Sequence, residues 1–409
     1  MSVSTEPTSP PDRAERDDRP AGPGLRAVLH GRAFGSSLTV LAFLVVFAVY
    51  SVWLGDRFVD LGARLLNIHQ NVPVLLIGLA AMVTLVAGKF DLSVSSTASL
   101  TAFLAVGLRT EQGMPFWLVL VSCLAVGLLV GLVNGFLVEY LSINAFIATL
   151  GTGGVVLGLS SVYSGGGALI PARGDFDLPA WFGDMGSFTN RPPTVVVVVV
   201  GLLAGAATVH GLAAVRPRRV PAGAWHAFRG AAGVLVAALV VWGLLAAGSS
   251  ATSGGLSWLI VLLVGVALVM WLLLELTTFG RGLKATGSNA EAARLAGIRT
   301  RRHVVGAFVI GGVLSALAGV TLAATQGTVA PDIAGAFLLP AFAAAFLSTV
   351  VFSSGPFTVW GTIAGGVFVV WVGQGLITGG LPATWTDVVN GAVLLVAVAL
   401  STVVRMARR

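Results

Sequence analysis

The sequence is short of the groups that most enzymes use. Its 409 residues include one cysteine, two lysines and five histidines, and only 10% of them are charged. The single Cys123 excludes an internal disulfide and any cysteine-based metal cluster. The histidines are scattered and form no pair at ligand spacing. Neither Lys89 nor Lys284 lies in a GxxxxGK[ST] motif, so there is no Walker A loop. We therefore expect no catalytic residue, no metal and no cofactor.

Acidic residues are also scarce within the apolar segments. Asp91, Glu139 and Glu275 all lie near the ends of apolar runs. Ion-coupled carriers usually bind the coupling ion through ionisable groups at depth, so this scarcity argues against secondary transport. A sodium site built from backbone carbonyls is still compatible with the sequence. Without a nucleophile–base pair or a metal cluster, a membrane enzyme is the weakest interpretation.

What is abundant is apolar surface. Hydrophobic residues make up 56% of the chain and the mean hydropathy is +0.93. Soluble domains carry about 25% charged residues, so this composition predicts an all-α polytopic membrane protein. The 53 glycines are nearly twice the ordinary share of about 7%. Small residues let membrane helices approach closely, which fits a helix bundle.

Apolar runs of the length that crosses a bilayer recur along the chain. About 20 residues are needed for one helical crossing. The sequence predicts twelve spans, near residues 34–54, 72–88, 92–109, 116–138, 145–163, 194–214, 229–248, 256–276, 303–325, 334–352, 357–378 and 386–404, within a domain covering 34–404. Only four residues, Gly88 to Asp91, separate the second span from the third. This pair is alternatively a broken helix that folds back inside the protein.

The basic residues indicate the orientation. A disordered tail, 1–33, precedes the first span, and a basic end, 405–409, follows the last. With both termini in the cytoplasm, 19 of the 24 lysines and arginines lie inside, as the positive-inside rule expects. The five outside are Arg57, Arg64, Arg109, Arg173 and Arg191. The net charge of +7 is therefore topological, and nucleic-acid binding has no separate support.

Two hydrophilic loops are longer than ordinary connections. The external loop, 164–193, is either a plain solvated loop or a surface whose acids and Trp181 meet another protein. The internal loop, 279–303, contains a predicted two-turn helix that Ser288 or Asn289 caps and Gly297 ends. Glu291 lies in its first turn, where the helix dipole favours negative charge. So short a helix needs a surface to pack on, either lipid headgroups or a partner protein.

This internal segment resembles the coupling-helix signature of monosaccharide ABC transporter permeases, the ribose/xylose group. The resemblance rests on Gly280-Arg281, Gly287-Ser288-Asn289 and Glu291-Ala292-Ala293-Arg294-Leu295-Ala296-Gly297-Ile298. Further similar stretches follow the family order between residues 72 and 404: Gly88-Lys89-Phe90-Asp91-Leu92-Ser93-Val94-Ser95-Ser96, Gly131-Leu132-Val133-Asn134-Gly135, Phe146-Ile147-Ala148-Thr149-Leu150-Gly151-Thr152 and the helix from Asn390 to Ala399. The combination is specific, although each piece alone is not.

The resemblance implies a transport subunit rather than an enzyme, in a bacterial inner membrane. ATP hydrolysis would belong to a separate ABC ATPase subunit, and an extracytoplasmic sugar-binding protein would deliver a monosaccharide, foremost a pentose such as xylose or ribose. It also implies a homodimer, embedded in membrane lipids. The residues it assigns to ATPase coupling are Gly287, Asn289, Glu291, Ala292, Arg294 and Gly297.

Two features depart from the family pattern. A Gly-rich stretch before the penultimate helix is replaced by Leu347 to Pro356, and Gln374 stands where asparagine is common. The spans near 194–214 and 229–248 exceed the ten-helix core and resemble the longer xylose-type permeases. A nucleoside, autoinducer or other small-solute permease of the same superfamily, or an ATP-independent carrier or channel, is the alternative.

Polar groups within the spans are candidates for the substrate pathway, because sugars are recognised by neutral hydroxyl, amide and aromatic groups. These candidates are Asp91, Asn134, Phe146, Thr149, Thr152, Gln326, Gln374 and Asn390. Asn134 must find a partner in the membrane, either another helix or the substrate. Asp91 is alternatively a helix cap or a partner of Lys89. Beside Asn134, Gly127, Gly131 and Gly135 recur every four residues, which predicts a helix-packing face.

Overall fold

The chain is a bundle of helices. The fold is that of a computed structural model, which describes residues 44–170, 177–214, 256–351 and 356–406. After an apolar helix at Leu44–Leu54, the helices in chain order are α3 (Asp56–Val59), α4 (Leu61–Gln70), α5 (Val72–Val86), α6 (Val94–Thr110), α7 (Phe116–Glu139), α8 (Ala145–Tyr163), α9 (Ala180–Gly186), α10 (Thr194–Ala214), α12 (Trp258–Leu276), α13 (Thr278–Ser288), α14 (Ala290–Leu295), α15 (Thr300–Gln326), the 3-10 turn η1 (Gly335–Phe337), α16 (Leu338–Val351), α17 (Val359–Thr378) and α18 (Trp385–Met406).

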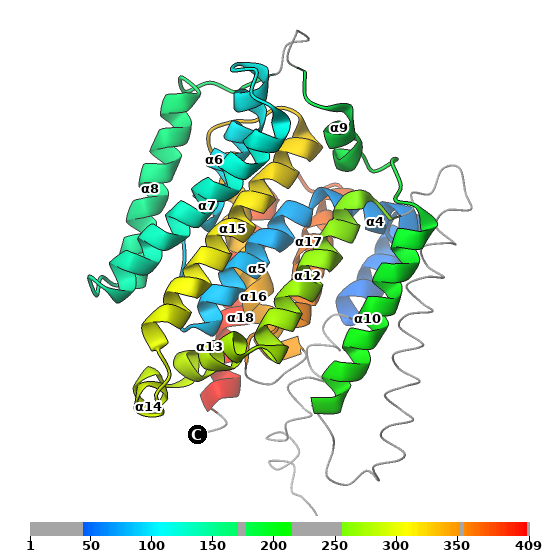
Figure 1. Cartoon of the computed structure of the whole chain (residues 1–409). Helices are drawn as coiled ribbons and strands as arrows, with labels where there is room; N and C mark the ends of the chain where they lie inside the picture. Colours follow the sequence, from blue (N-terminus) through cyan, green and yellow to red (C-terminus); the bar gives the residue numbers. More distant parts are fainter. Residues whose placement is uncertain (1–43, 171–176, 215–255, 352–355, 407–409) are drawn as a thin grey trace, which may run out of the picture.

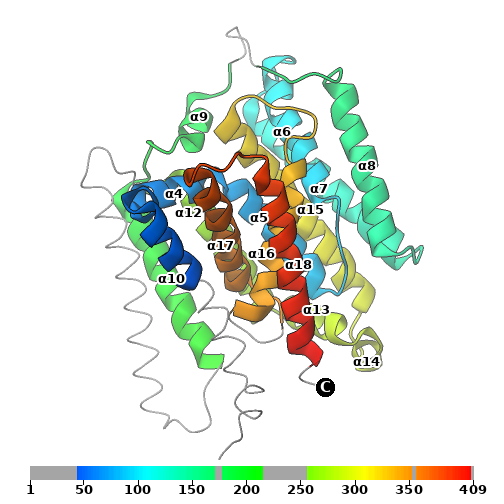
Figure 2. The ribbon, with the colours of Figure 1, turned by 180° about the vertical axis from the view of Figure 1, so that it is seen from behind.

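Helix α5 forms the centre of the bundle. All 15 of its residues are buried, and α15, α16, α17 and α6 pack around it (Figures 1 and 2). A helix that is apolar on every side belongs in a core, because it has no face to offer water. Helix α8 lies at the edge of the bundle and packs against α6 and α7. The two ends of the bundle differ. Figure 1 shows α14 and the C-terminus at one end, which we call the α14 end, and α9 at the other, the α9 end.

The predicted glycine face is confirmed. A side chain on Gly127 or Gly131 of α7 would collide with the backbone of α15, at the Gly312 and Phe308 carbonyl oxygens. Gly135 continues the stripe, with Val305 Cα 3.0 Å from the place of its missing Cβ. The absence of side chains along α7 therefore allows two long helices to pack backbone against backbone.

The predicted spans and the observed helices agree closely. The boundaries of 116–138 and 145–163 match α7 and α8 to within one residue. The span 229–248 and the tail 1–33 lie outside the described residues. Five described helices are long and apolar enough to cross a membrane, and the bent pair α4 and α5, at 56°, makes six. The all-α polytopic class is confirmed, while twelve spans and cytoplasmic termini stay predictions.

The two long loops contain helices. The internal loop 279–303 is mostly α13, α14 and the start of α15, whereas the sequence predicted one short helix there. The external loop 164–193 contains α9, and Leu169 pairs with Val329 in an isolated antiparallel bridge.

A buried histidine joins three elements at the α9 end. His69 of α4 is 3% exposed, and its Nε2 lies 2.9 Å from the carbonyl oxygen of Gly186 in α9. Because that oxygen can only accept, Nε2 donates, and Nδ1 accepts from the Ser257 hydroxyl at 2.7 Å. Ser257 caps α12. His69 thus ties α4, α9 and α12 together.

Candidate functional site

Both ends of α14 are capped as the sequence predicted. The Asn289 side chain accepts from the backbone N–H of Ala292 at 3.0 Å. At the other end Gly297 has φ +83°, where a side chain would be strained. The Gly297 N–H donates to Arg294 and the Ile298 N–H to Ala293, both at 3.0 Å. This Schellman arrangement stops the helix after six residues.

Most of α14 is open to solvent at the α14 end. Ala293 is its one buried residue, while Leu295 is 81% exposed and Ala292 is exposed beside it. Glu291 and Arg294 form an ion pair on the helix surface. This short helix therefore has an apolar face that nothing in the described chain covers.

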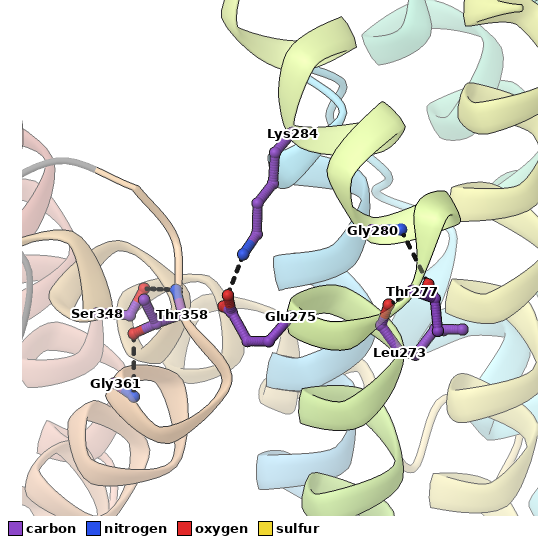
Figure 3. Close-up of polar contacts among 8 residues, drawn as sticks. All are labelled: Leu273, Glu275, Thr277, Gly280, Lys284, Ser348, Thr358 and Gly361. Carbon is purple, nitrogen blue, oxygen red and sulfur yellow. Dashed lines mark hydrogen bonds and ion pairs between the residues drawn. The ribbon is translucent and has the colours of Figure 1, made fainter. Parts of the chain in front are cut away.

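Helix α13 attaches α14 to the bundle. Figure 3 shows Lys284 of α13 reaching Glu275 in the last turn of α12, with Nζ and Oε1 2.6 Å apart. Between the two helices, Thr277 Oγ1 donates to the Leu273 carbonyl at 2.6 Å and accepts from the Gly280 N–H at 3.2 Å. Thr277 therefore ends one helix and caps the next.

The stretch that departs from the family pattern is held by the same kind of cap. Ser348 in α16 accepts from the Thr358 N–H at 3.4 Å, and Thr358 Oγ1 accepts from the Gly361 N–H at 3.2 Å (Figure 3). Hydroxyl groups here cap α17 and tie it to α16.

Helix α13 also lies against the end of the central helix. A Cβ on Gly287 would collide with the carbonyl oxygen of Val86, the last residue of α5. Gly88, with φ +76°, faces the Gly287 carbonyl across the same contact. Helix α13 and the turn after α5 are thus in direct backbone contact.

From this contact the chain turns back into the bundle through a non-helical link, residues 87–93. Lys89 pairs with Glu139 at the end of α7, Nζ to Oε1 at 3.2 Å. Asp91 and Ser93 are each 1% exposed. Ser93 in turn reaches Asn134, five residues or about 7.5 Å back along α7. Irregular backbone at such depth is tolerated only where protein shields it from lipid. Two helices are therefore joined by a link that is exposed at Gly88 and Phe90 and buried at Asp91 and Ser93, and Asp91 does not pair with Lys89.

A buried hydrogen-bond network holds this link. Asp91 Oδ1 accepts from the Ser93 N–H at 3.0 Å and from the Ser93 hydroxyl at 2.6 Å. The Asn134 amide donates to Ser93 Oγ at 2.8 Å and accepts from Thr152 Oγ1 at 2.5 Å. Thr149 Oγ1 accepts from the Leu92 N–H at 3.0 Å. Four predicted pathway residues, Asp91, Asn134, Thr149 and Thr152, thus meet in one place.

The other four predicted pathway residues lie elsewhere. Phe146 is 52% exposed on the wall of an open groove of about 1170 Å³ at the α14 end. Gln326 is the last residue of α15 and is exposed. Gln374 and Asn390 line a separate cavity of about 200 Å³ at the α9 end, together with Asn71. Sequence reasoning missed Asn71, although a polar residue between two apolar runs, next to Pro73, was a visible signal.

Comparison with known proteins assigns the family. The family model described as "Branched-chain amino acid transport system / permease component" matches residues 65–398. The chain belongs to this permease family. A relative, the autoinducer 2 import system permease protein LsrD of Klebsiella pneumoniae, is 27% identical over 359 residues, 88% of this chain and 89% of its own length. LsrC of Escherichia coli K12 is 25% identical over 358 residues, 88% of this chain and 84% of its own.

Another relative is LsrC of Photorhabdus luminescens, 26% identical over 356 residues, 87% of this chain and 86% of its own. No solved structure matches. The permease is thus a multi-pass protein of the inner membrane and a transport subunit of the sugar-type ABC importer family.

Proposed function

We propose that this permease forms the membrane pathway of an ATP-driven importer and that α14 docks on a separate ATPase subunit. The observation that carries this proposal is α14 itself, a helix capped at both ends that exposes Leu295 and Ala292. Because the ATPase subunit would lie in the cytoplasm, docking on α14 orients the permease with its α14 end facing the cytoplasm. The basic side chains at that end, among them Lys89, Arg281 and Arg302, agree with the positive-inside rule.

The contacts that α13 makes with α12 and α5 could transmit a movement of the ATPase to the membrane helices. The ion pair Lys284–Glu275 holds α13 against α12, and Gly287 abuts Val86 at the end of the central helix. A movement of α14 therefore reaches the link 87–93 through backbone contact. We assign Asp91, Asn134, Thr149 and Thr152 to holding that link. The first three are buried and bond to Ser93 or Leu92 of the link, and Thr152 bonds to Asn134. The residues that we assign to coupling with the ATPase are Gly287, Asn289, Glu291, Ala292, Arg294 and Gly297.

The proposed cargo is a monosaccharide, foremost a pentose such as xylose or ribose. Autoinducer 2 is the second candidate, favoured by the names of the LsrC and LsrD relatives. A sugar-binding protein would deliver the cargo at the α9 end, where Trp181 is 53% exposed. A second copy of the permease would complete the pathway, with membrane lipids around the pair.

Reconstitution tests this proposal. The permease, its ATPase and its binding protein are placed in liposomes, and ATP hydrolysis is measured with ribose, xylose or autoinducer 2. Stimulation by one solute, with uptake that needs ATP, is the expected result. Uptake by the permease alone would identify an ATP-independent carrier instead.

A matched pair of variants tests the docking helix. Leu295→Arg places a charge on the exposed apolar face, and we expect ATPase binding to weaken about tenfold or more, which corresponds to about 1.4 kcal/mol. Leu61→Arg is the control, because Leu61 is 50% exposed at the α9 end. Equal binding by both variants would contradict docking through α14.

A further inference from the structure

The cavity at the α9 end lies between helices that come from distant parts of the chain. Its volume is about 200 Å³, and its walls come from the first turn of α5, the 3-10 turn η1, the end of α17 and the start of α18. Figure 2 shows the connection between α17 and α18 at this end of the bundle. In the proposed orientation, the cavity faces the side from which a delivered solute arrives.

The three carboxamide side chains that line this cavity have donor or acceptor groups without a hydrogen-bond partner in the described chain. Asn390 is 7% exposed, and its side chain makes no hydrogen bond to any other described residue. Gln374, another lining residue, is half-buried, and its side chain likewise makes no hydrogen bond to any other described residue. Asn71 uses one amide hydrogen, which it donates to the Asn67 carbonyl at 2.8 Å, and its remaining groups are unused. Buried polar groups are expected to have partners, and the Asn390 amide is buried, so these groups are available to bind molecules that enter the cavity.

The lining selects the chemistry of those molecules. Each carboxamide both donates and accepts, which matches hydroxyl groups that also do both. Phe337 adds an aromatic face on which a ring can lie. Asp387 is the one charged residue among the described residues of the lining, and none of them is lysine or arginine. A phosphate or a carboxylate would therefore lose its hydration without gaining a counter-charge.

We propose that this cavity binds a neutral, polyhydroxylated solute of monosaccharide size, through Asn71, Gln374 and Asn390. The site deepens the proposed function and rests on it for the direction of delivery. It also separates this permease from a carrier of amino acids, whose carboxylate would find no basic partner among the described lining residues.

Cysteine protection on the full-length permease in nanodiscs tests the site. Cys123 is 0% exposed, so a cysteine introduced as Ile377→Cys, at a lining position that supplies no amide, is the reactive one toward a membrane-impermeant maleimide. We expect excess ribose or xylose to slow its labelling about threefold or more, because an occupied site excludes the reagent, whereas ribose 5-phosphate leaves the rate unchanged. Gln112→Cys, exposed at the same end, is the control and should react equally with and without sugar.

A second variant checks that protection comes from the site. Adding Asn390→Leu to Ile377→Cys removes one of the three amides, and protection by ribose should disappear. If the maleimide still does not label Cys123 in this variant, the bundle has not unfolded. The proposal would be overturned if ribose and xylose slowed the labelling of Ile377→Cys no more than that of Gln112→Cys, or if ribose 5-phosphate protected Ile377→Cys equally well. The assay needs no ATPase, so failure of ATP-driven uptake leaves its result readable.

Discussion

Lys89 Nζ lies 3.2 Å from Glu139 Oε1, and this ion pair joins the link after the central helix to the last turn of α7. The two side chains are 34% and 14% exposed, so the pair is only partly open to water. Lys89 is next to Gly88, which faces α13. The ion pair therefore connects α13 with α7.

Exchanging the two charges in the double variant Lys89→Glu, Glu139→Lys tests this ion pair. Lys89→Glu or Glu139→Lys alone brings like charges together, and each should lower the melting temperature and the sugar-stimulated ATPase rate. We expect a coupling free energy of about 1–2 kcal/mol from the double-mutant cycle, above the value of exposed pairs because water screens this pair less. A double variant no better than the worse single variant would mean that the two residues do not interact.

Glu291→Lys reverses the charge in the first turn of α14. The helix dipole and the ion pair with Arg294 both favour the glutamate. We expect the membrane fold to persist and ATP-driven uptake to fall about tenfold or more, because the charge sits on the docking surface. Glu111→Lys makes the same change at the α9 end and should retain uptake. Normal uptake by Glu291→Lys would contradict the docking role.

Gly131→Ala tests the packing of α7 on α15. Its new methyl group meets the Phe308 carbonyl oxygen, so we expect a loss of about 1–3 kcal/mol, as for overpacked cores. Gly154→Ala in α8 is the matched control, since no atom lies within 4 Å of its new Cβ. Thermal unfolding in nanodiscs measures both, and equal melting temperatures would refute backbone contact at Gly131.

Asn134→Ala removes the centre of the buried network. The hydroxyls of Ser93 and Thr152 lose a partner, which costs about 1–3 kcal/mol for a buried group. Hydrogen exchange at residues 87–93 should rise, while ribose still protects Ile377→Cys at the other end. Asn144→Ala, which removes an exposed cap of α8, is the control. Loss of ribose protection in Asn134→Ala would instead place the network in the binding site.

The long spans were predictable and the short helices were not. Spans such as α7 are uniformly apolar runs bounded by Pro115 and by Glu139, so composition alone locates them. Helix α13 contains Gly280, Gly282 and Gly287, which lower its helix propensity, and the sequence predicted a loop there. Close packing against Leu274, His303 and Val86 leaves room only for glycine, and this tertiary constraint overrides propensity.

The candidate site was predictable in its residue types and not in its grouping. Hydroxyl and amide groups within apolar spans identified Asn134, Thr149 and Gln374. Which of them meet depends on the link 87–93, whose path follows contacts between residues far apart in the chain, such as Asn134 with Ser93. No local pattern contains that information.

Gly127 and Gly312 occupy each other's missing side-chain space, since a Cβ on either would strike the carbonyl oxygen of the other. Two backbones in such contact have no flexible side chain between them to absorb sliding or tilting. During a transport cycle α7 and α15 are therefore expected to travel as a single rigid body. The hinges that open and close the pathway must then lie at the edges of this pair, where the link 87–93 and helix α13 join it to the rest of the permease.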